Sequence, residues 1–257
     1  MRRFIILAGI AVVATTAACI DMSAPSGGPA SISLLQLPAA FVVAGDTMRD
    51  SAGRVMPLGV IAFDGSGAVI ANARPRFFVT DSVAFAHIDT VNNVLVGDSS
   101  GIVHVIGQVG NLQTPVVTIP VTVAPTTLAA NAIDTLAAPL SGDTTAHGTE
   151  SVGVRVTGAT DSTVQGVIVH FALLDTLPST DPSRLAAYLV DDQANVSGLD
   201  TTDVSGNAAR TLVIVPARIA QGTPNPIALR VQATATYRGA QLAGSPVIIS
   251  VPVKVGR

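Results

Sequence analysis

Few residues of this 257-residue sequence have the types and spacing that could do chemistry, and the clearest set is residues 97–101, GDSSG. They fit the G-x-S-x-G pattern, in which a strained turn from a strand into a helix exposes a nucleophilic serine, here Ser99. Residues 102–106 continue a strand pattern instead, and the position of His104 on that strand does not place it as the base for Ser99. We therefore interpret the segment as a hairpin turn rich in glycine and serine.

Metal binding is the other chemistry that the residue types allow. The histidines (His87, His104, His147 and His170) are scattered and lack the close spacing of zinc ligands. Oxygen ligands suited to calcium lie closer together, at Asp191, Asp192, Asn195, Asp200 and Asp203. Their spacing does not fit an EF-hand, and Asp and Asn are also ordinary turn residues. The sequence therefore predicts no metal or cofactor, and leaves Asp191, Asp192, Asp200 and Asp203 as calcium candidates.

The charge balance argues against nucleic acid as a partner. Lys and Arg number 14 against 17 Asp and Glu, for a formal net charge of -3, and Arg2 and Arg3 belong to the N-terminal segment described next. No block of basic residues is available to neutralise phosphates. Anionic membrane surfaces are poor candidates for the same reason.

The N-terminus has the features of an export signal. Arg2 and Arg3 precede an apolar run over residues 4–14, which is shorter than the ~20 residues that cross a bilayer. Small residues then lead to Cys19, the single cysteine of the chain. This arrangement resembles the lipobox of bacterial lipoproteins, and the resemblance implies that Cys19 is lipidated and becomes the mature N-terminus. Simple secretion and an uncleaved anchor are the alternatives. Ile20 is not the aspartate associated with inner-membrane retention, which favours the outer membrane.

Composition and periodicity predict an all-β protein. Glu150 and Lys254 are the single glutamate and lysine of the chain, so strong surface helix formers are nearly absent. Apolar residues alternate along residues 152–156, 227–233 and 247–255, which is typical of half-buried strands. Short strands separated by Gly, Pro, Asn and Asp indicate two β-sandwiches in tandem.

The chain divides into four expected parts. Residues 1–18 form the signal peptide, and residues 19–30 form a tether rich in Gly, Pro and Ser that we expect to be flexible. The first unit covers residues 31–124, and Pro125-Thr126-Thr127 separates it from the second unit, residues 126–257. Two long polar segments of the second unit, residues 175–184 and 216–226, are the predicted contact loops, because binding surfaces often lie on such loops.

Both units resemble known bacterial domains. Residues 42–47, 60–67, 94–97 and 101–106 look like successive strands of group 2 bacterial immunoglobulin-like domains, with Phe77-Phe78 where that family often has tryptophan. Residues 166–171 and 201–208 are similar to the group 1 domains of invasin and intimin. The resemblance implies immunoglobulin-like sandwiches in an extracytoplasmic module that spaces, displays or adheres.

These observations predict an exported, lipid-anchored, non-enzymatic surface or periplasmic protein that acts as an adhesive, spacer or protein-interaction module. Its expected partners are the membrane, through the lipid on Cys19, and a protein or cell-surface partner. The alternative is binding of cell-surface or extracellular polysaccharide, which Tyr188 or Tyr237 exposed beside a groove would favour. A hydrolase is the least favoured function.

Overall fold

The computed structural model describes residues 28–83, 85–133, 135–140, 147–223 and 225–256. The described chain is built of strands joined by turns, with two short 3₁₀ segments, η1 (Ala159–Asp161) and η2 (Pro216–Arg218). The predicted all-β class is confirmed. No helix in these ranges is long and apolar enough to cross a membrane.

The first unit carries the strands up to residue 122, namely β1 (Ser31–Ile32), β2 (Val42–Val43), β3 (Ala62–Phe63), β4 (Arg76–Val79), β5 (Ala86–Asp89), β6 (Val94–Gly97), β7 (Gly101–Val109), β8 (Leu112–Gln113) and β9 (Val117–Thr122). Its main sheet has the order β2-β9-β7-β4, with β8 paired to β7. The hairpin β5-β6 and the short pair β1-β3 form separate two-stranded sheets.

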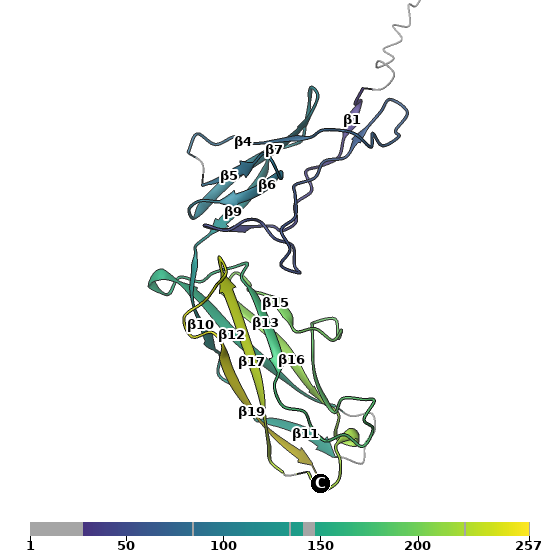
Figure 1. Ribbon diagram of the computed structural model, residues 1–257, viewed down its shortest axis with the longest axis vertical. Helices are drawn as coiled ribbons and strands as arrows, with labels where there is room; N and C mark the ends of the chain where they lie inside the picture. Colours follow the sequence, from purple (N-terminus) through teal and green to yellow (C-terminus); the bar gives the residue numbers. More distant parts are fainter. Residues whose placement is uncertain (1–27, 84, 134, 141–146, 224, 257) are drawn as a thin grey trace, which may run out of the picture.

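The second unit is a larger sandwich. Its strands are β10 (Pro125–Ala130), β11 (Leu136–Leu140), β12 (Gly148–Gly158), β13 (Ile168–Leu173), β14 (Ala187–Val190), β15 (Leu199–Thr201), β16 (Asn207–Ile214), β17 (Ile227–Tyr237), β18 (Ala240–Gln241) and β19 (Val247–Gly256). One sheet has the order β10-β12-β16-β14 and the other β11-β19-β17-β13-β15. Figure 1 shows the two units end to end, joined where β9 leads into β10.

The strand order identifies both units as immunoglobulin-like. In the second unit the two sheets correspond to the A-B-E-D and G-F-C layers of that fold. In both units an early short strand pairs in parallel with the last strand, β2 with β9 and β11 with β19. The order β2-β9-β7-β4 therefore repeats the order β11-β19-β17-β13, while the opposing layer of the first unit is reduced.

Alternation in the sequence places the cores as predicted. Val152, Val154 and Val156 are fully buried, as are alternate residues of β17 and β19. One apolar cluster draws its buried members from positions 35–121 and another from positions 128–253. At β4, Phe77 is buried and Phe78 lies on the outer face, 40% exposed.

Two local features differ from the expected boundaries. Pro125, Thr126 and Thr127 do not form a separate linker, because they are the first residues of β10. Pro125 and Thr127 pair with the end of β12, with a register shift at Thr126. Ala30, expected in the tether, donates its backbone N–H to the carbonyl of Phe63 and extends the β1-β3 pairing. The rest of the expected tether, up to residue 27, lies outside the described residues.

Candidate functional site

The two predicted contact loops form one structure at the end of the second unit opposite the first unit (Figure 1). The N–H of Thr180 donates to the carbonyl of Arg218, and the N–H of Ala220 donates to the carbonyl of Pro178. The guanidinium of Arg218 also donates to the carbonyl of Leu185 at 3.1 Å. Backbone N–H groups of each loop thus donate to carbonyls of the other, which holds both loops in one arrangement.

The loop residue Leu177 shows that this end is not merely solvated. Its side chain is 9% exposed and belongs to the core cluster of the second unit, with Ile219 of the other loop packed against the same cluster. Shortening both loops to Gly/Ser turns would therefore remove core contacts and cost stability, contrary to what their polar composition suggests.

An apolar groove lies at the base of residues 175–185. It has a volume of about 270 Å³ and lies between β13 and β14, at the open side of the sandwich. Phe171, Leu173 and Leu177 line its interior. Leu185 and Val196, which also line it, are 61% and 75% exposed. Large exposed apolar side chains beside a cavity are typical of an interaction site. We name this feature the edge groove.

Asp175 is the charged residue among those that line the edge groove, and Arg230 of β17 pairs with it. The guanidinium makes contacts of 2.7 and 3.1 Å to the two carboxylate oxygens, and the backbone N–H of Arg230 donates to the same carboxylate at 2.7 Å. These hydrogen bonds hold the pKa of Asp175 below its usual value, and those from the Arg230 side chain have the largest effect. The pair fixes one end of the loop while leaving the groove without net charge.

The Asp175–Arg230 pair predicts an acid-sensitive contribution to stability. Because the folded-state pKa of Asp175 is lowered, the contribution is present above the ordinary Asp pKa of about 4 and is lost as pH falls through the lower, folded-state value. We expect Asp175→Asn to lower the unfolding midpoint at pH 7, and the gap from wild type to close at acid pH. The measurement is the thermal unfolding midpoint as a function of pH, and Asp192→Asn, at an exposed position, is the control. A gap that stayed constant down to acid pH would contradict this assignment.

A second candidate site is the joint between the units. Phe41 packs over Gly166, where an added Cβ would fall well inside van der Waals contact of the ring. The hydroxyl of Tyr237 donates to the carbonyl of Ala44, and the hydroxyl of Thr122 donates to the carbonyl of Gln165 at 3.0 Å. Gly166 has φ +92°, a left-handed conformation that favours glycine. Both units therefore contribute residues to one fitted contact.

Both tyrosines singled out for sugar binding are half-buried. Tyr237 borders a cavity of about 460 Å³ at the joint, together with Asp46, Arg49 and His170. Its hydroxyl is engaged by the first unit. Tyr188 packs against Val190, Val213 and Val215. Tyr188 also lines the edge groove, so each tyrosine lies beside a cavity with its side chain partly buried, and the polysaccharide alternative stays a prediction.

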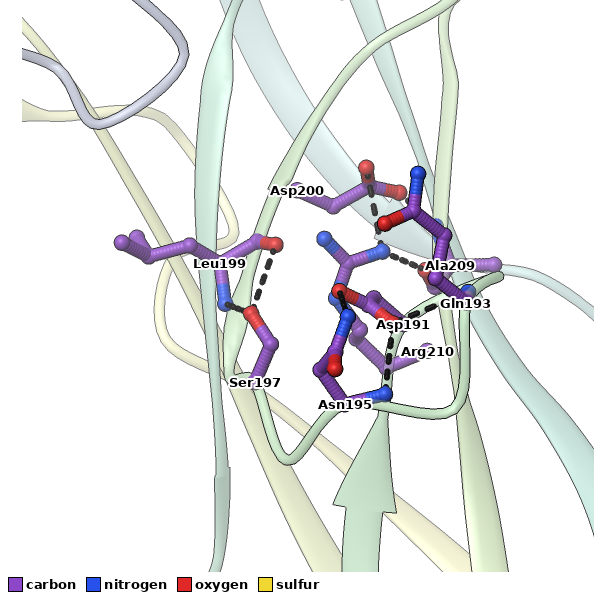
Figure 2. Close-up of polar contacts among 8 residues, drawn as sticks. All are labelled: Asp191, Gln193, Asn195, Ser197, Leu199, Asp200, Ala209 and Arg210. Atoms are coloured by element: carbon purple, nitrogen blue, oxygen red, sulfur yellow. Dashed lines mark hydrogen bonds and ion pairs between the residues drawn. The ribbon is translucent and has the colours of Figure 1, made fainter.

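Figure 2 shows the hydrogen bonds of two calcium candidates, Asp191 and Asp200. The carboxylate of Asp191 accepts the N–H groups of Gln193 and Asn195 at 2.9 and 2.8 Å. These hydrogen bonds lower the pKa of Asp191, and the one from the backbone N–H of Asn195 has the largest effect. Asp203 caps its own turn in the same way, accepting from Ser205 and Asn207. Among the described residues, no three His, Cys, Asp or Glu side chains gather as metal ligands.

Asp200 instead pairs with a buried cation. Its carboxylate lies 3.1 Å from the guanidinium of Arg210 and accepts the N–H of Ala209 at 2.7 Å (Figure 2). The Arg210 side chain is 9% exposed, and its Nε is buried with no hydrogen-bond partner. Asp200 therefore has a structural role, as the partner of a buried cation, that the sequence did not reveal.

The G-x-S-x-G segment connects β6 to β7 and leads into a strand, as predicted. It is not a hairpin turn, because β6 pairs with β5, whereas β7 pairs with β4, β8 and β9 in another sheet. Asp98 of this segment pairs with His87 at 2.9 Å, and His104 pairs with Asp81 at 2.7 Å. No hydrogen bond joins Ser99 to either histidine within the described chain. The segment thus lacks the serine–base contact of a nucleophile elbow.

Cys19, the predicted lipidation site, lies outside the described residues.

Sequence reasoning located the contact loops but missed the joint and the edge groove. A signal for the groove exists in the apolar Leu174, Leu177 and Leu185, which punctuate a polar segment. Phe41 and Gly166 carry no comparable signal, because only the fold brings residues so distant in sequence together.

No protein-family model matches the sequence, and no curated protein matches it. Solved structures with similar architecture include the adhesin InvE of Yersinia pseudotuberculosis, with a TM-score of 0.36, 16% identity and coverage of 91% of this chain and 62% of that one. For domains 4-9 of the surface layer protein SbsC, the TM-score is 0.32 and the identity 12%, with coverage of 89% of this chain and 30% of that one. For invasin, a bacterial integrin-binding protein, the TM-score is 0.30 and the identity 13%, with coverage of 88% of this chain and 40% of that one. The chain thus spans less than two thirds of each. With such low scores, the fold assignment rests on the strand order instead.

Proposed function

We propose that the protein is an exported, lipid-anchored, non-enzymatic module of the cell envelope that holds a protein-binding surface away from the membrane. The observation that carries the proposal is the paired loop structure beside the edge groove, with Leu185 and Val196 exposed at its rim. The paired loops lie at the end of the second unit opposite the first unit (Figure 1). The joint supports a spacer role, because contacts from both units oppose free bending there.

The anchor is tested at Cys19. Several acyl chains, at ~0.8 kcal/mol per buried CH₂, give stable attachment where a single chain would be marginal. Replacing Cys19 with serine should move the protein to the soluble fraction or leave it unprocessed. Fractionation of cells followed by mass spectrometry of the N-terminal peptide measures both results. A wild-type protein that carries no lipid would remove the anchor, and with it the outer-membrane location, from the proposal.

The binding surface is tested by adhesion. Residues 19–257 displayed on a non-adherent bacterium should promote attachment to cells or to a surface. Leu185→Ser and Val196→Ser should each reduce attachment several-fold, because burying a large apolar side chain at an interface contributes about 1.5–3 kcal/mol. Val204→Ser is the matched control, since Val204 is 72% exposed and does not line the groove.

Equal loss of attachment in all three variants, or no loss in any of them, would place the adhesive surface elsewhere.

We also infer that residues 31–124 and 126–257 are separate folding units, which the separate clusters of buried residues support.

A further inference from the structure

We propose that the edge groove takes a short, extended, uncharged peptide segment of its partner, which adds to β14 as an extra strand. This inference rests on the proposed function and specifies its ligand. Three features of the groove carry it: unpaired backbone groups, neutral charge, and an apolar interior with an apolar rim.

The register of β14 leaves the backbone groups of one residue directed at the open edge, those of Ala187, which is 5% exposed and lines the groove, because the carbonyl of Leu185 already accepts from Arg218. Ala187 lies opposite Ile214 of β16, and the N–H of Val215 donates to the carbonyl of Ala186. Because hydrogen-bonded pairs alternate along an antiparallel ladder, the N–H and C=O of Ala187 point away from β16. No described residue pairs with them, whereas farther along the strand the N–H of Ser197 donates to the carbonyl of Leu189.

The facing strand is open in the same region. The N–H of Leu174 donates to the carbonyl of Arg230, so the N–H and C=O of Leu173 point away from β17. On the side of β13 away from β17, β15 pairs with Ile168, Val169 and His170. The final hydrogen bond on that side runs from the N–H of Phe171 to the carbonyl of Gly198. The groove thus lies between two strand segments that each lack a neighbour.

These features together specify the occupant. Unpaired N–H and C=O groups at a strand edge match an extended backbone, which is the basis of recognition by strand addition. Alternate side chains of such a peptide would face the apolar interior formed by Phe171, Leu173 and Leu177. Since Arg230 already neutralises Asp175, the groove favours an uncharged segment over an acidic or basic one.

The experiment begins by selecting a probe. Phage-displayed random nonapeptides are panned against immobilised residues 19–257, and the enriched peptide is synthesised with a fluorescent label. We expect apolar residues at alternate positions and no net charge. Its affinity for the same chain is then measured by fluorescence polarisation, with a peptide of the same composition and shuffled order as control.

Single backbone N-methylation of the probe tests strand addition itself. Methylation removes one N–H at a time, and in a strand only alternate N–H groups face the neighbouring strand. Because Ala187 offers one N–H and one C=O, we expect at least tenfold weaker binding when the one peptide N–H that meets Ala187 is methylated, and less than a twofold change at the positions on either side of it. Leu185→Ser and Val196→Ser should each weaken binding at least fivefold, and Val204→Ser should not change it.

Weakening by the Leu185 and Val196 variants without a methylation position that weakens binding would mean that side chains alone dock in the groove. That result would overturn strand addition and leave the proposed function intact. Failure to enrich any peptide, or binding that ignores the groove variants, would also overturn the inference. The adhesion assay with the same variants then decides separately whether the proposed function stands.

Discussion

Gly166→Ala is expected to open the joint between the two units and to destabilise the protein by about 3 kcal/mol. Part of this cost, about 1–2 kcal/mol, comes from placing a Cβ in a left-handed conformation. The rest comes from the clash with Phe41, which must leave its site or force the units apart. Chemical denaturation measures the first effect, and small-angle X-ray scattering measures the second as a broader distribution of molecular lengths.

Gly67→Ala is the matched control for the joint. Gly67 also has a left-handed conformation, φ +83°, but an added Cβ there meets nothing within 4 Å. The control should therefore show the conformational cost alone and an unchanged scattering profile. Equal effects of the two substitutions would mean that Phe41 does not hold the joint. Separate expression of residues 31–124 and 126–257 completes the test, because cooperative unfolding of each half would show that the joint couples two independent cores.

Asp200→Ala is the second substitution with a large expected effect, a loss of about 3 kcal/mol. It removes the acceptor for both the Arg210 guanidinium and the N–H of Ala209, and so leaves a buried cation without its carboxylate. Arg210→Met should be far milder, within about 1 kcal/mol of wild type, because an apolar side chain of similar length needs no partner. Denaturant unfolding of the variants gives both values.

Asp192→Ala separates this explanation from calcium binding. Asp192 is exposed, and its substitution should change stability by less than about 0.5 kcal/mol. If calcium were held here, adding the ion would raise the unfolding temperature of wild type, and Asp192→Ala would reduce that increase. A calcium-dependent increase of this kind would contradict the assignment of Asp200 as a purely structural partner of Arg210.

The sequence by itself determined the class of fold. Alternating apolar residues such as Val152, Val154 and Val156 specify strands locally, because successive side chains of a strand face opposite sides. The connection at Gly97–Gly101 could be assigned for the same reason, since the strand pattern resumes directly after it. Residues 175–184 and 216–226 were recognisable as loops from composition.

Only the tertiary structure decided how these parts meet. The burial of Leu177, the pairing of Asp200 with Arg210 and the packing of Phe41 on Gly166 depend on contacts between residues far apart in sequence or on the register of strands. The edge groove exists because β14 is the last strand of its sheet and β15 covers only residues 168–170 of β13, which leaves Ala187 and Leu173 turned to the open edge. Periodicity determines which face of a strand is buried, but only the pairing of strands determines which edge is left open.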